Sequence, residues 1–322
     1  MKYYNFTEKI DNKRIYNLWN NSYQSIYPID EALFNRNVSN IYEHSSFYVL
    51  NDNDQLVGFV LAKIWNDEFK INGYDDSAWI SLIYVDPQYR NQGIGTKLLD
   101  LVEKEMRQLG KKVLYLGKDY LNYFPGLPID LKNNKSWFEK KGFKYTYDTC
   151  DLIKNVREKE ESKLQLRNNN YIFRTACLKD KEELINFIHQ NWPGRWEKEA
   201  IDYFQNGGEG EEYCIALDNN KICAFAKIGY PKTKIMEISY SLTWRNRFKS
   251  LGGIGPLGVD SQYRKRNLGY DIVAFANNVL IEKNVQEIII DWTGLLDFYR
   301  KLGFEVFKSY AYMTKELNKE RN

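Results

Sequence analysis

The sequence is poor in histidine, cysteine and proline. Its 322 residues include two histidines, four cysteines and seven prolines. Because the cysteines are far apart and form no CxxC pair, we expect no zinc site. We also expect the thiols to stay reduced, since an even cysteine count in a chain this long is a poor indicator of disulfides. Twenty glycines and seven prolines are too few for a collagen-like or low-complexity chain.

Long apolar runs and a strong net charge are also lacking. No stretch approaches the roughly 20 apolar residues that cross a bilayer, and residues 1–14 lack the apolar core of a signal peptide. The 46 basic and 43 acidic side chains leave a net charge of only +3. This charge predicts neither a nucleic-acid nor a membrane partner. We therefore expect a soluble cytoplasmic protein that is a monomer or a homodimer and contacts small molecules.

Apolar material, in contrast, is plentiful. Hydrophobic residues make up 43% of the chain and aromatic residues 16%, which is enough for packed cores. The length exceeds the usual size of one compact domain, so two domains are the better expectation.

An internal repeat organises the sequence. Residues 85–90 (VDPQYR) and 259–264 (VDSQYR) agree at five of six positions, 174 residues apart. Apolar residues at i, i+4 spacing follow each block and predict a long amphipathic helix. A second pair of blocks, 138–143 (FEKKGF) and 299–304 (YRKLGF), is 161 residues apart. The first copy therefore carries thirteen extra residues, which coincide with the Pro/Gly-rich segment 120–130.

A charged stretch separates the copies. Residues 154–167 carry eight charges in fourteen positions, as expected of a solvated connector. We predict an N-terminal domain at 1–155, a linker at 156–168 and a C-terminal domain at 169–322. Each half contains hairpins followed by a strand, the long helix, a buried strand, a short helix and a final strand. The predicted fold class is α/β (mixed α+β), with two tandem domains, each a mostly antiparallel mixed sheet flanked by helices.

A glycine loop lies between a predicted strand and the long helix of the first copy. Residues 90–95 (RNQGIG) follow an apolar strand, and glycines there let backbone amides approach an anion at a helix N-terminus. A tight turn without a ligand is the alternative interpretation. The GxGxxG and GK[ST] patterns are absent, which disfavours nicotinamide and P-loop nucleotide sites.

The pattern VDPxYRxxGxG before a helix, followed by an aromatic-x-K-x-G-F turn, resembles the GNAT superfamily of acyl-CoA-dependent N-acyltransferases. The resemblance covers both halves. It implies acetyl-CoA as the cofactor, held by loop amides and by the strand before the loop. In the first half it assigns this role to Ile83, Tyr84, Val85, Arg90, Asn91, Gln92, Gly93, Ile94, Gly95 and Thr96. In the second half it assigns the role to Leu257, Gly258, Val259, Arg264, Lys265, Arg266, Asn267, Leu268, Gly269 and Tyr270.

The second loop departs from the family pattern. Asn267 replaces the first loop glycine, and asparagine is the non-glycine residue that best tolerates left-handed backbone geometry. The basic run Arg264, Lys265 and Arg266 could compensate electrostatically. The alternative is a half that has lost its cofactor and is only structural.

The resemblance also implies catalytic residues. Members of the family commonly protonate the departing thiolate with a tyrosine, and Tyr299 has that place in the second half, whereas the first has Phe138. Asp291, at the end of the apolar strand EIIIDW, could accept the proton of the ammonium group. Core packing for Tyr299 and turn capping for Asp291 remain the alternatives. Both halves lack the family's asparagine seven residues before the tyrosine.

The acceptor is predicted less sharply. The segments YFPGLP (123–128) and IDWT (290–293) resemble two-domain glucosamine and glucosaminide N-acetyltransferases. An amino sugar needs a flat platform, for which Trp292, Trp244 and Tyr123 are candidates. The main expectation is an enzyme that acetylates a primary amine. The alternatives are a non-catalytic acyl-CoA sensor and a protein or peptide N-acetyltransferase.

Overall fold

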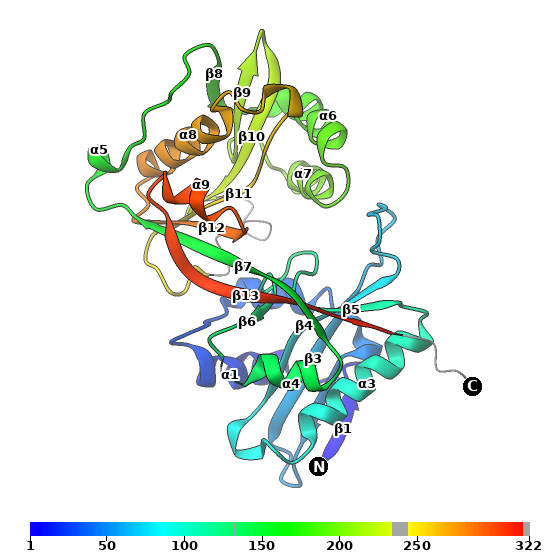
Figure 1. The fold of residues 1–322 in the computed structure, drawn as a ribbon. Coiled ribbons are helices and arrows are strands. Elements are labelled where there is room, and N and C mark those ends of the chain that lie inside the picture. The colour runs from blue at the N-terminus through cyan, green and yellow to red at the C-terminus, as the bar shows by residue number, and fades with distance from the viewer. Residues whose placement is uncertain (132, 234–243, 318–322) are drawn as a thin grey trace. The chain divides into compact units, whose positions relative to one another are not determined.

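The computed structural model describes residues 1–131, 133–233 and 244–317, and the chain divides into two compact units (Figure 1). Unit 1 contains Met1–Thr149 and Ser309–Asn322, and unit 2 contains Cys150–Lys308. Two long strands, β7 (Lys144–Asn155) and β13 (Glu305–Glu316), each contribute residues to both units.

Unit 1 is a mixed sheet with helices on both faces. Its strands run in the order β1-β2-β3-β4-β5-β13, with β6 pairing β13, and β4 and β5 are parallel while the other described pairs are antiparallel. The strands are β1 (Lys2–Asn5), β2 (Phe47–Leu50), β3 (Leu56–Ile64), β4 (Ser77–Val85), β5 (Val113–Leu116) and β6 (Leu127–Pro128). The helices are α1 (Asn12–Tyr23), α2 (Glu31–Val38), α3 (Ile94–Gln108) and α4 (Asn134–Lys140).

Alternation along the strands explains why both faces of this sheet are covered. Val60 and Ile80 pack with the apolar stripe of α3, whose Leu98 and Val102 are fully buried. On the opposite face, the rings of α1 contact the Tyr84 ring of β4, with the Trp19 and Tyr84 centroids 6.0 Å apart. The loop between β4 and α3 therefore lies at the end of a rigid, fully packed sheet.

Unit 2 repeats this plan. Its strands run in the order β7-β12-β11-β10-β9-β8, with β11 and β12 parallel and the other described pairs antiparallel. The strands are β8 (Ile172–Thr175), β9 (Tyr213–Asp218), β10 (Lys221–Gly229), β11 (Leu251–Val259) and β12 (Glu287–Thr293). The helices are α5 (Lys159–Ser162), α6 (Lys181–Asn191), α7 (Arg195–Gln205), α8 (Leu268–Glu282) and α9 (Leu296–Arg300).

The fold class expected from the sequence is confirmed. The parallel pair begins at Ser77↔Val113 in unit 1 and at Leu251↔Glu287 in unit 2, so the two copies share even the register of their central strands. The units differ from the domains predicted at 1–155, 156–168 and 169–322. The predicted linker includes α5 of unit 2, and the last strand of the chain completes the sheet of unit 1. A repeat reveals similar elements but does not reveal which sheet a terminal strand joins.

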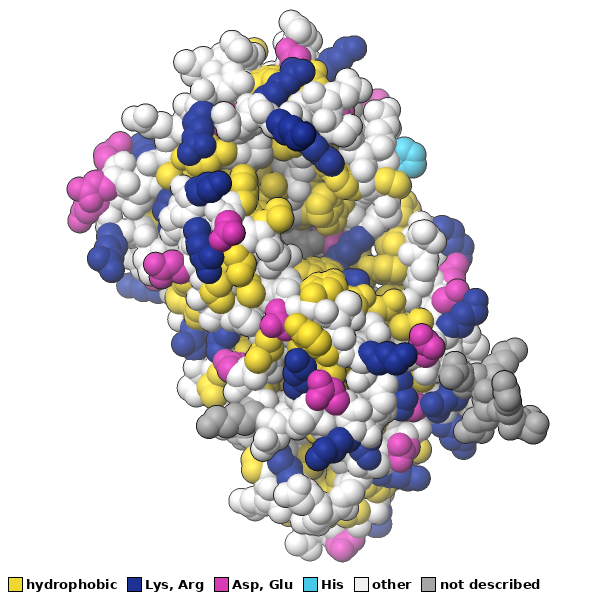
Figure 2. All heavy atoms as spheres, viewed as in Figure 1, with side chains coloured by type: hydrophobic (Ala, Val, Ile, Leu, Met, Phe, Trp, Pro, Cys, Tyr) yellow, Lys and Arg dark blue, Asp and Glu magenta, His cyan; other side chains and the backbone are white. Residues whose placement is uncertain are grey.

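Several features bear on the predicted absences. Among the described residues, no group of three or more histidine, cysteine or acidic side chains could hold a metal ion, and no helix is long and apolar enough to cross a membrane. The four cysteines are all free thiols. On the face drawn in Figure 2, basic and acidic side chains are interspersed.

Candidate active site

Each unit has a fork between its two parallel central strands. In unit 1 the described pairing of β4 with β5 ends at Ile80↔Leu116, while β4 continues to Val85. In unit 2 the pairing of β11 with β12 ends at Ile254↔Ile290, and β11 continues to Val259. A strand that leaves its neighbour exposes backbone groups on one edge, so each fork can receive an extended ligand.

The loop after β4 presents backbone nitrogens at the start of α3. Asn91 and Gly93 have φ of +61° and +81°, and Gly93 is the N-cap of the helix. No described residue accepts a hydrogen bond from the backbone nitrogens of residues 91–96. Left-handed residues that turn successive N–H groups toward one point, followed by a helix N-terminus, form an anion-binding concavity.

A cleft with a volume of about 430 Å³ lies beside this loop. It is lined by nine of the ten residues expected to bind the cofactor in the first half; Gln92 instead donates a side-chain hydrogen bond to the Gln88 carbonyl. Arg90 lines the cleft but donates to the Val85 carbonyl at 2.9 Å, which anchors the loop. The cleft also has lining residues that were not assigned to the cofactor: Tyr23, Tyr89, Asn133, Asn134, Trp137 and Phe138.

Asparagines do reach this cleft from the start of α4. Counting seven residues back from Phe138 gives Leu131, which is why the sequence indicated that the asparagine was missing. Asn133, which has φ of +68° at the N-cap of α4, and Asn134 both line the cleft. The start of α4 therefore places amide side chains at this cleft although the family's asparagine position holds Leu131.

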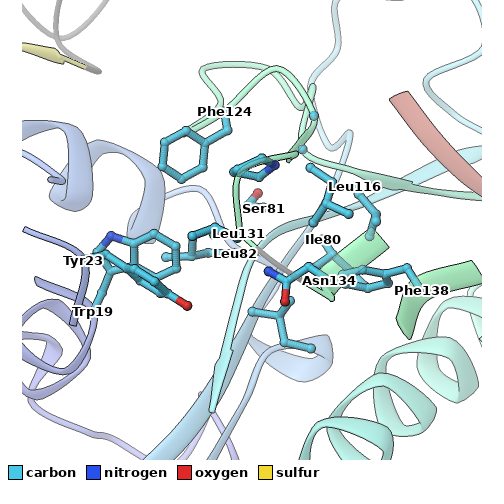
Figure 3. Close-up of a pocket in the computed structure, with 15 residues that line it drawn as sticks. Trp19, Tyr23, Ile80, Ser81, Leu82, Leu116, Phe124, Leu131, Asn134 and Phe138 are labelled. Carbon is cyan, nitrogen blue, oxygen red and sulfur yellow. The ribbon is translucent and has the colours of Figure 1, made fainter. Parts of the chain in front are cut away.

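Behind the fork of unit 1 is a smaller and mostly apolar cavity of about 70 Å³ (Figure 3). The rings of Trp19, Tyr23 and Phe124 surround Ser81 on one side, and Leu116 and Phe138 lie on the other. Phe124 comes from the segment inserted in the first copy. None of the described residues that line this cavity carries a carboxylate or imidazole.

The corresponding cavity of unit 2 has a volume of about 340 Å³ and contains acidic and phenolic groups. Asp291 from β12 and Tyr299 from α9 line it together. Gly255 on β11 is needed here, because a Cβ at this position would lie 2.6 Å from Oδ1 of Asp291. The structure thus brings together the two predicted catalytic residues.

Burial shifts both pKa values upward. The pKa of Asp291 is raised well above its usual value by burial and by the charge of Asp151, with Glu199 acting in the same direction and Arg195 opposing it. The pKa of Tyr299 is raised by burial and by the charge of Asp291. Tyr299 therefore keeps its proton at neutral pH, and Asp291 binds protons more readily than an ordinary aspartate.

An aromatic wall completes this cavity. The guanidinium carbon of Arg195 lies 4.6 Å from the ring centroid of Trp292, and its Nε is 2.8 Å from Oε1 of Glu199. Trp196 lines the same cavity. The sequence did not indicate Arg195, Trp196 or Glu199, because α7 lies outside the repeated blocks and a helix of this kind carries no local motif.

Two of the three proposed platforms are in the protein interior. Trp244 and Tyr123 are each 1% exposed. The indole nitrogen of Trp244 donates to Asp151 at 2.8 Å, and the Tyr123 hydroxyl donates to the Phe34 carbonyl at 3.3 Å. The prediction that these rings stack on a substrate was wrong, since both are buried; Trp292 lines the unit 2 cavity.

The second loop has the backbone of the first. Lys265 and Asn267 both have φ of +61°, and their counterparts Asn91 and Gly93 in the first loop also have positive φ. Helix α8 begins directly after Asn267. No described residue accepts a hydrogen bond from the backbone nitrogens of residues 265–270. The expectation that asparagine permits the loop to form is confirmed.

The remaining residues assigned to the second loop have mixed environments. Leu257 lines the cavity of unit 2, whereas the backbone of Gly258 is covered by the ring of Trp192, which would lie 2.3 Å from a Cβ there. Tyr270 is covered by the guanidinium of Arg167, whose central carbon lies 3.6 Å from its ring centroid. Leu268 is buried, Val259 and Gly269 are half-buried, and Arg264 and Arg266 are exposed or nearly so.

Comparison with known proteins gives the same division into two copies. A sequence model of the acetyltransferase (GNAT) family matches residues 12–123 and 181–304. No curated protein sequence matches the chain significantly.

Three solved structures illustrate the likeness in fold. A GCN5-related glucosamine N-acetyltransferase region of a fungal multi-domain GH3 β-N-acetylglucosaminidase has 22% identity and a TM-score of 0.84, covering 97% of this chain and 38% of that one. A tandem GNAT protein from the clavulanic acid biosynthesis pathway has 11% identity and a TM-score of 0.67, covering 98% of both chains. A GCN5-related N-acetyltransferase from Sphaerobacter thermophilus has 15% identity and a TM-score of 0.62, covering 85% and 81%. At these identities the likeness shows the fold alone.

Proposed function

The chain belongs to the acetyltransferase (GNAT) family, and we propose that it transfers the acetyl group of acetyl-CoA to the primary amine of an amino sugar such as glucosamine, with the chemistry in unit 2. One observation carries this assignment. Asp291 and Tyr299 line the same cavity at the fork of unit 2; the raised pKa makes Asp291 a stronger base, and the raised pKa of Tyr299 keeps its hydroxyl protonated and able to donate.

The chain's residues fit acetyl-CoA in two places. Each unit has a fork that leads to a loop of unpartnered backbone nitrogens, and a diphosphate requires such donors. In unit 1 the residues that would hold the cofactor are those lining the 430 Å³ cleft, with Gly95 close enough to Trp137 that a Cβ would lie 3.5 Å from the indole. In unit 2 they are residues 265–270 and Leu257. When bound, the cofactor supplies an acetyl thioester.

The two titratable groups then act in sequence on protons. An amine is protonated at neutral pH, so Asp291 must hold its carboxylate form to take the ammonium proton and leave a nucleophilic nitrogen. Tyr299 Oη donates a proton to the departing thiolate. No described residue is hydrogen bonded to this hydroxyl, so it is free to serve as that donor.

The walls of the unit 2 cavity fit a sugar amine. The Trp292 ring offers apolar surface to a sugar ring, and Asp291 offers acceptors for hydroxyl and ammonium groups. The glucosamine N-acetyltransferase region of the fungal protein, to which the chain is similar over 97% of its length, supports the same class of acceptor.

Unit 1 favours a different role, that of an acyl-CoA site without chemistry. Phe138 and Gly117 stand where unit 2 has Tyr299 and Asp291, and Phe138 has no proton to donate. We propose that unit 1 binds acetyl-CoA without turning it over.

A thiol-release assay tests the proposal. Glucosamine, polyamines, amino acids and peptides are offered to the purified chain with acetyl-CoA, and thiol is followed with a chromogenic disulfide. We expect turnover with glucosamine that is abolished by Asp291→Asn, while calorimetry shows two acetyl-CoA sites per chain. Turnover with peptides alone would show that the acceptor is a protein or peptide amine and not an amino sugar. If no amine were acetylated, the chain would instead be a non-catalytic acyl-CoA sensor.

A further inference from the structure

The first repeat supplies a buried carboxylate that is bonded to the backbone of β12 in unit 2. Asp151 lies on β7, the last strand of the first repeat, and is 1% exposed. Its Oδ1 accepts the backbone N–H of Trp292 at 3.1 Å, and its Oδ2 accepts the indole N–H of Trp244 at 2.8 Å. The N–H of Trp292 belongs to the peptide group that follows Asp291, so the first bond holds the backbone next to the proposed base.

The backbone is irregular at the same point. Ile290 pairs with Leu152 and Thr293 pairs with Cys150, so two residues of β12 lie opposite the single residue Asp151. Such a bulge re-aims side chains and is frequent beside active sites. Trp292 also has φ of +47°, which is costly for an aromatic residue and requires compensating contacts. The hydrogen bond from Asp151 supplies one such contact.

The counterpart in unit 1 differs. The register of β13 with β5 places Tyr312 opposite the fork, the position that Asp151 has in unit 2. Tyr312 has no carboxylate, and its hydroxyl accepts a hydrogen bond from Nζ of Lys118 at 3.0 Å. The carboxylate is therefore specific to the unit that has the acid and base.

We propose that Asp151 is a positioning residue of the unit 2 active site, which holds the bulged peptide between Asp291 and Trp292 and thereby aims the carboxylate and the indole into the cavity. This inference rests on the proposed function. The groups that face Asp291 are Asp151 on β7, Arg195 and Glu199 on α7, and Tyr299 on α9. Asp151 accepts a hydrogen bond from the backbone of β12.

Asp151→Asn tests the proposal, because it preserves size but removes the charge and puts an N–H₂ group where the carboxylate now accepts hydrogen bonds. We expect kcat to fall by at least about tenfold, because misplacement of a catalytic group slows the reaction. Loss of the negative neighbour lowers the pKa of Asp291, so the rise of kcat/KM with pH moves to lower pH by about one unit. Adding Trp244→Phe removes the surplus donor; this double variant should regain kcat and keep the shift in the pH profile. Glu212→Gln, which removes a buried charge bonded to Tyr203, should leave the profile unchanged.

A second measurement does not depend on turnover. With ¹³C-carboxyl aspartate, the resonance missing from Asp291→Asn identifies Asp291, and its titration midpoint should fall in Asp151→Asn and in the double variant but not in Glu212→Gln. Superimposable pH profiles and titrations in the wild-type and Asp151→Asn chains would overturn the proposal, as would an equal shift in Glu212→Gln. A wild-type chain without turnover would overturn the proposed function, and the titration would still decide the role of Asp151.

Discussion

Replacing Tyr299 by phenylalanine separates catalysis from folding at this site. Tyr299 is 4% exposed, and its ring packs against Phe298 and Phe304 with centroids 4.9 and 6.2 Å away. Phenylalanine keeps these contacts. No described residue is hydrogen bonded to the hydroxyl, so its removal leaves no buried group unpaired, and the free energy of unfolding should change by less than about 0.5 kcal/mol.

The catalytic effect should be far larger. A positioned general acid contributes about 10²–10⁴-fold, which corresponds to about 3–5 kcal/mol in the transition state. We expect kcat for glucosamine to fall by at least about tenfold, with KM for acetyl-CoA changed less than about twofold, because the hydroxyl acts on the leaving group rather than on binding. Since the pKa of Tyr299 is raised, the wild-type rate should not decline as pH rises through the ordinary tyrosine range.

Steady-state kinetics with the thiol-release assay provide the measurement, and Tyr213→Phe is the matched control. Tyr213 is a fully buried tyrosine of unit 2 whose hydroxyl has no hydrogen-bond partner among the described residues. Removal of this hydroxyl should therefore leave kcat unchanged and should not destabilise the fold. Equal kcat in Tyr299→Phe and the wild type would remove Tyr299 from the mechanism, and equal losses in both variants would point to packing.

Three further outcomes follow from particular contacts. Gly93→Val should weaken one of two acetyl-CoA sites in calorimetry, because valine resists φ of +81° and its branched side chain blocks the loop amides; Gly73→Val, at φ of +80° away from the cleft, should affect stability but not affinity. Asp180→Asn should lower the free energy of unfolding by about 1–2 kcal/mol at pH 7, since Arg174 depresses the pKa of Asp180 to about 2. This stabilisation is present above about pH 4 and is lost as pH falls toward 2. Urea unfolding of the wild-type and Asp180→Asn chains should therefore coincide near pH 2. Trp292→Ala should raise KM for glucosamine about tenfold without raising KM for acetyl-CoA, and an unchanged KM would exclude Trp292 as the platform.

Local patterns predicted the sheet well. The buried strand expected after the long helix of the first copy is β5, and the loop that opens α3 begins where glycine and asparagine allow a left-handed turn. These features depend on residues close in sequence, so one chain is enough to predict them. The resemblance to the GNAT family, which the repeated blocks carry, indicated Asp291 and Tyr299, and both line one cavity of unit 2.

Long-range features could not be predicted in this way. Both β7 and β13 alternate polar and apolar residues as any strand does, and that alternation is satisfied in either sheet. The sequence therefore placed the division between the repeats and missed Asp151, whose role depends on β7 pairing with β12. Arg195 and Trp244 were missed or misassigned for a similar reason, since burial and ring contacts depend on the tertiary fold.

The two forks share a register, yet transferring the acid and base from unit 2 to unit 1 should not transfer activity. Gly117 and Phe138 stand at the places of Asp291 and Tyr299, but Gly117 has φ of +63°, and a Cβ there would lie 2.5 Å from the Phe124 carbonyl oxygen. Ser81 stands where unit 2 has glycine, so it would also crowd a carboxylate. We expect a chain with Asp291→Asn, Tyr299→Phe, Gly117→Asp and Phe138→Tyr to be inactive in the thiol-release assay although its unit 1 still binds acetyl-CoA by calorimetry. Recovered turnover would show that the identity of two side chains is sufficient; its absence, with binding retained, would show that the space left by Gly255 and the bulge opposite Asp151 are part of the active site.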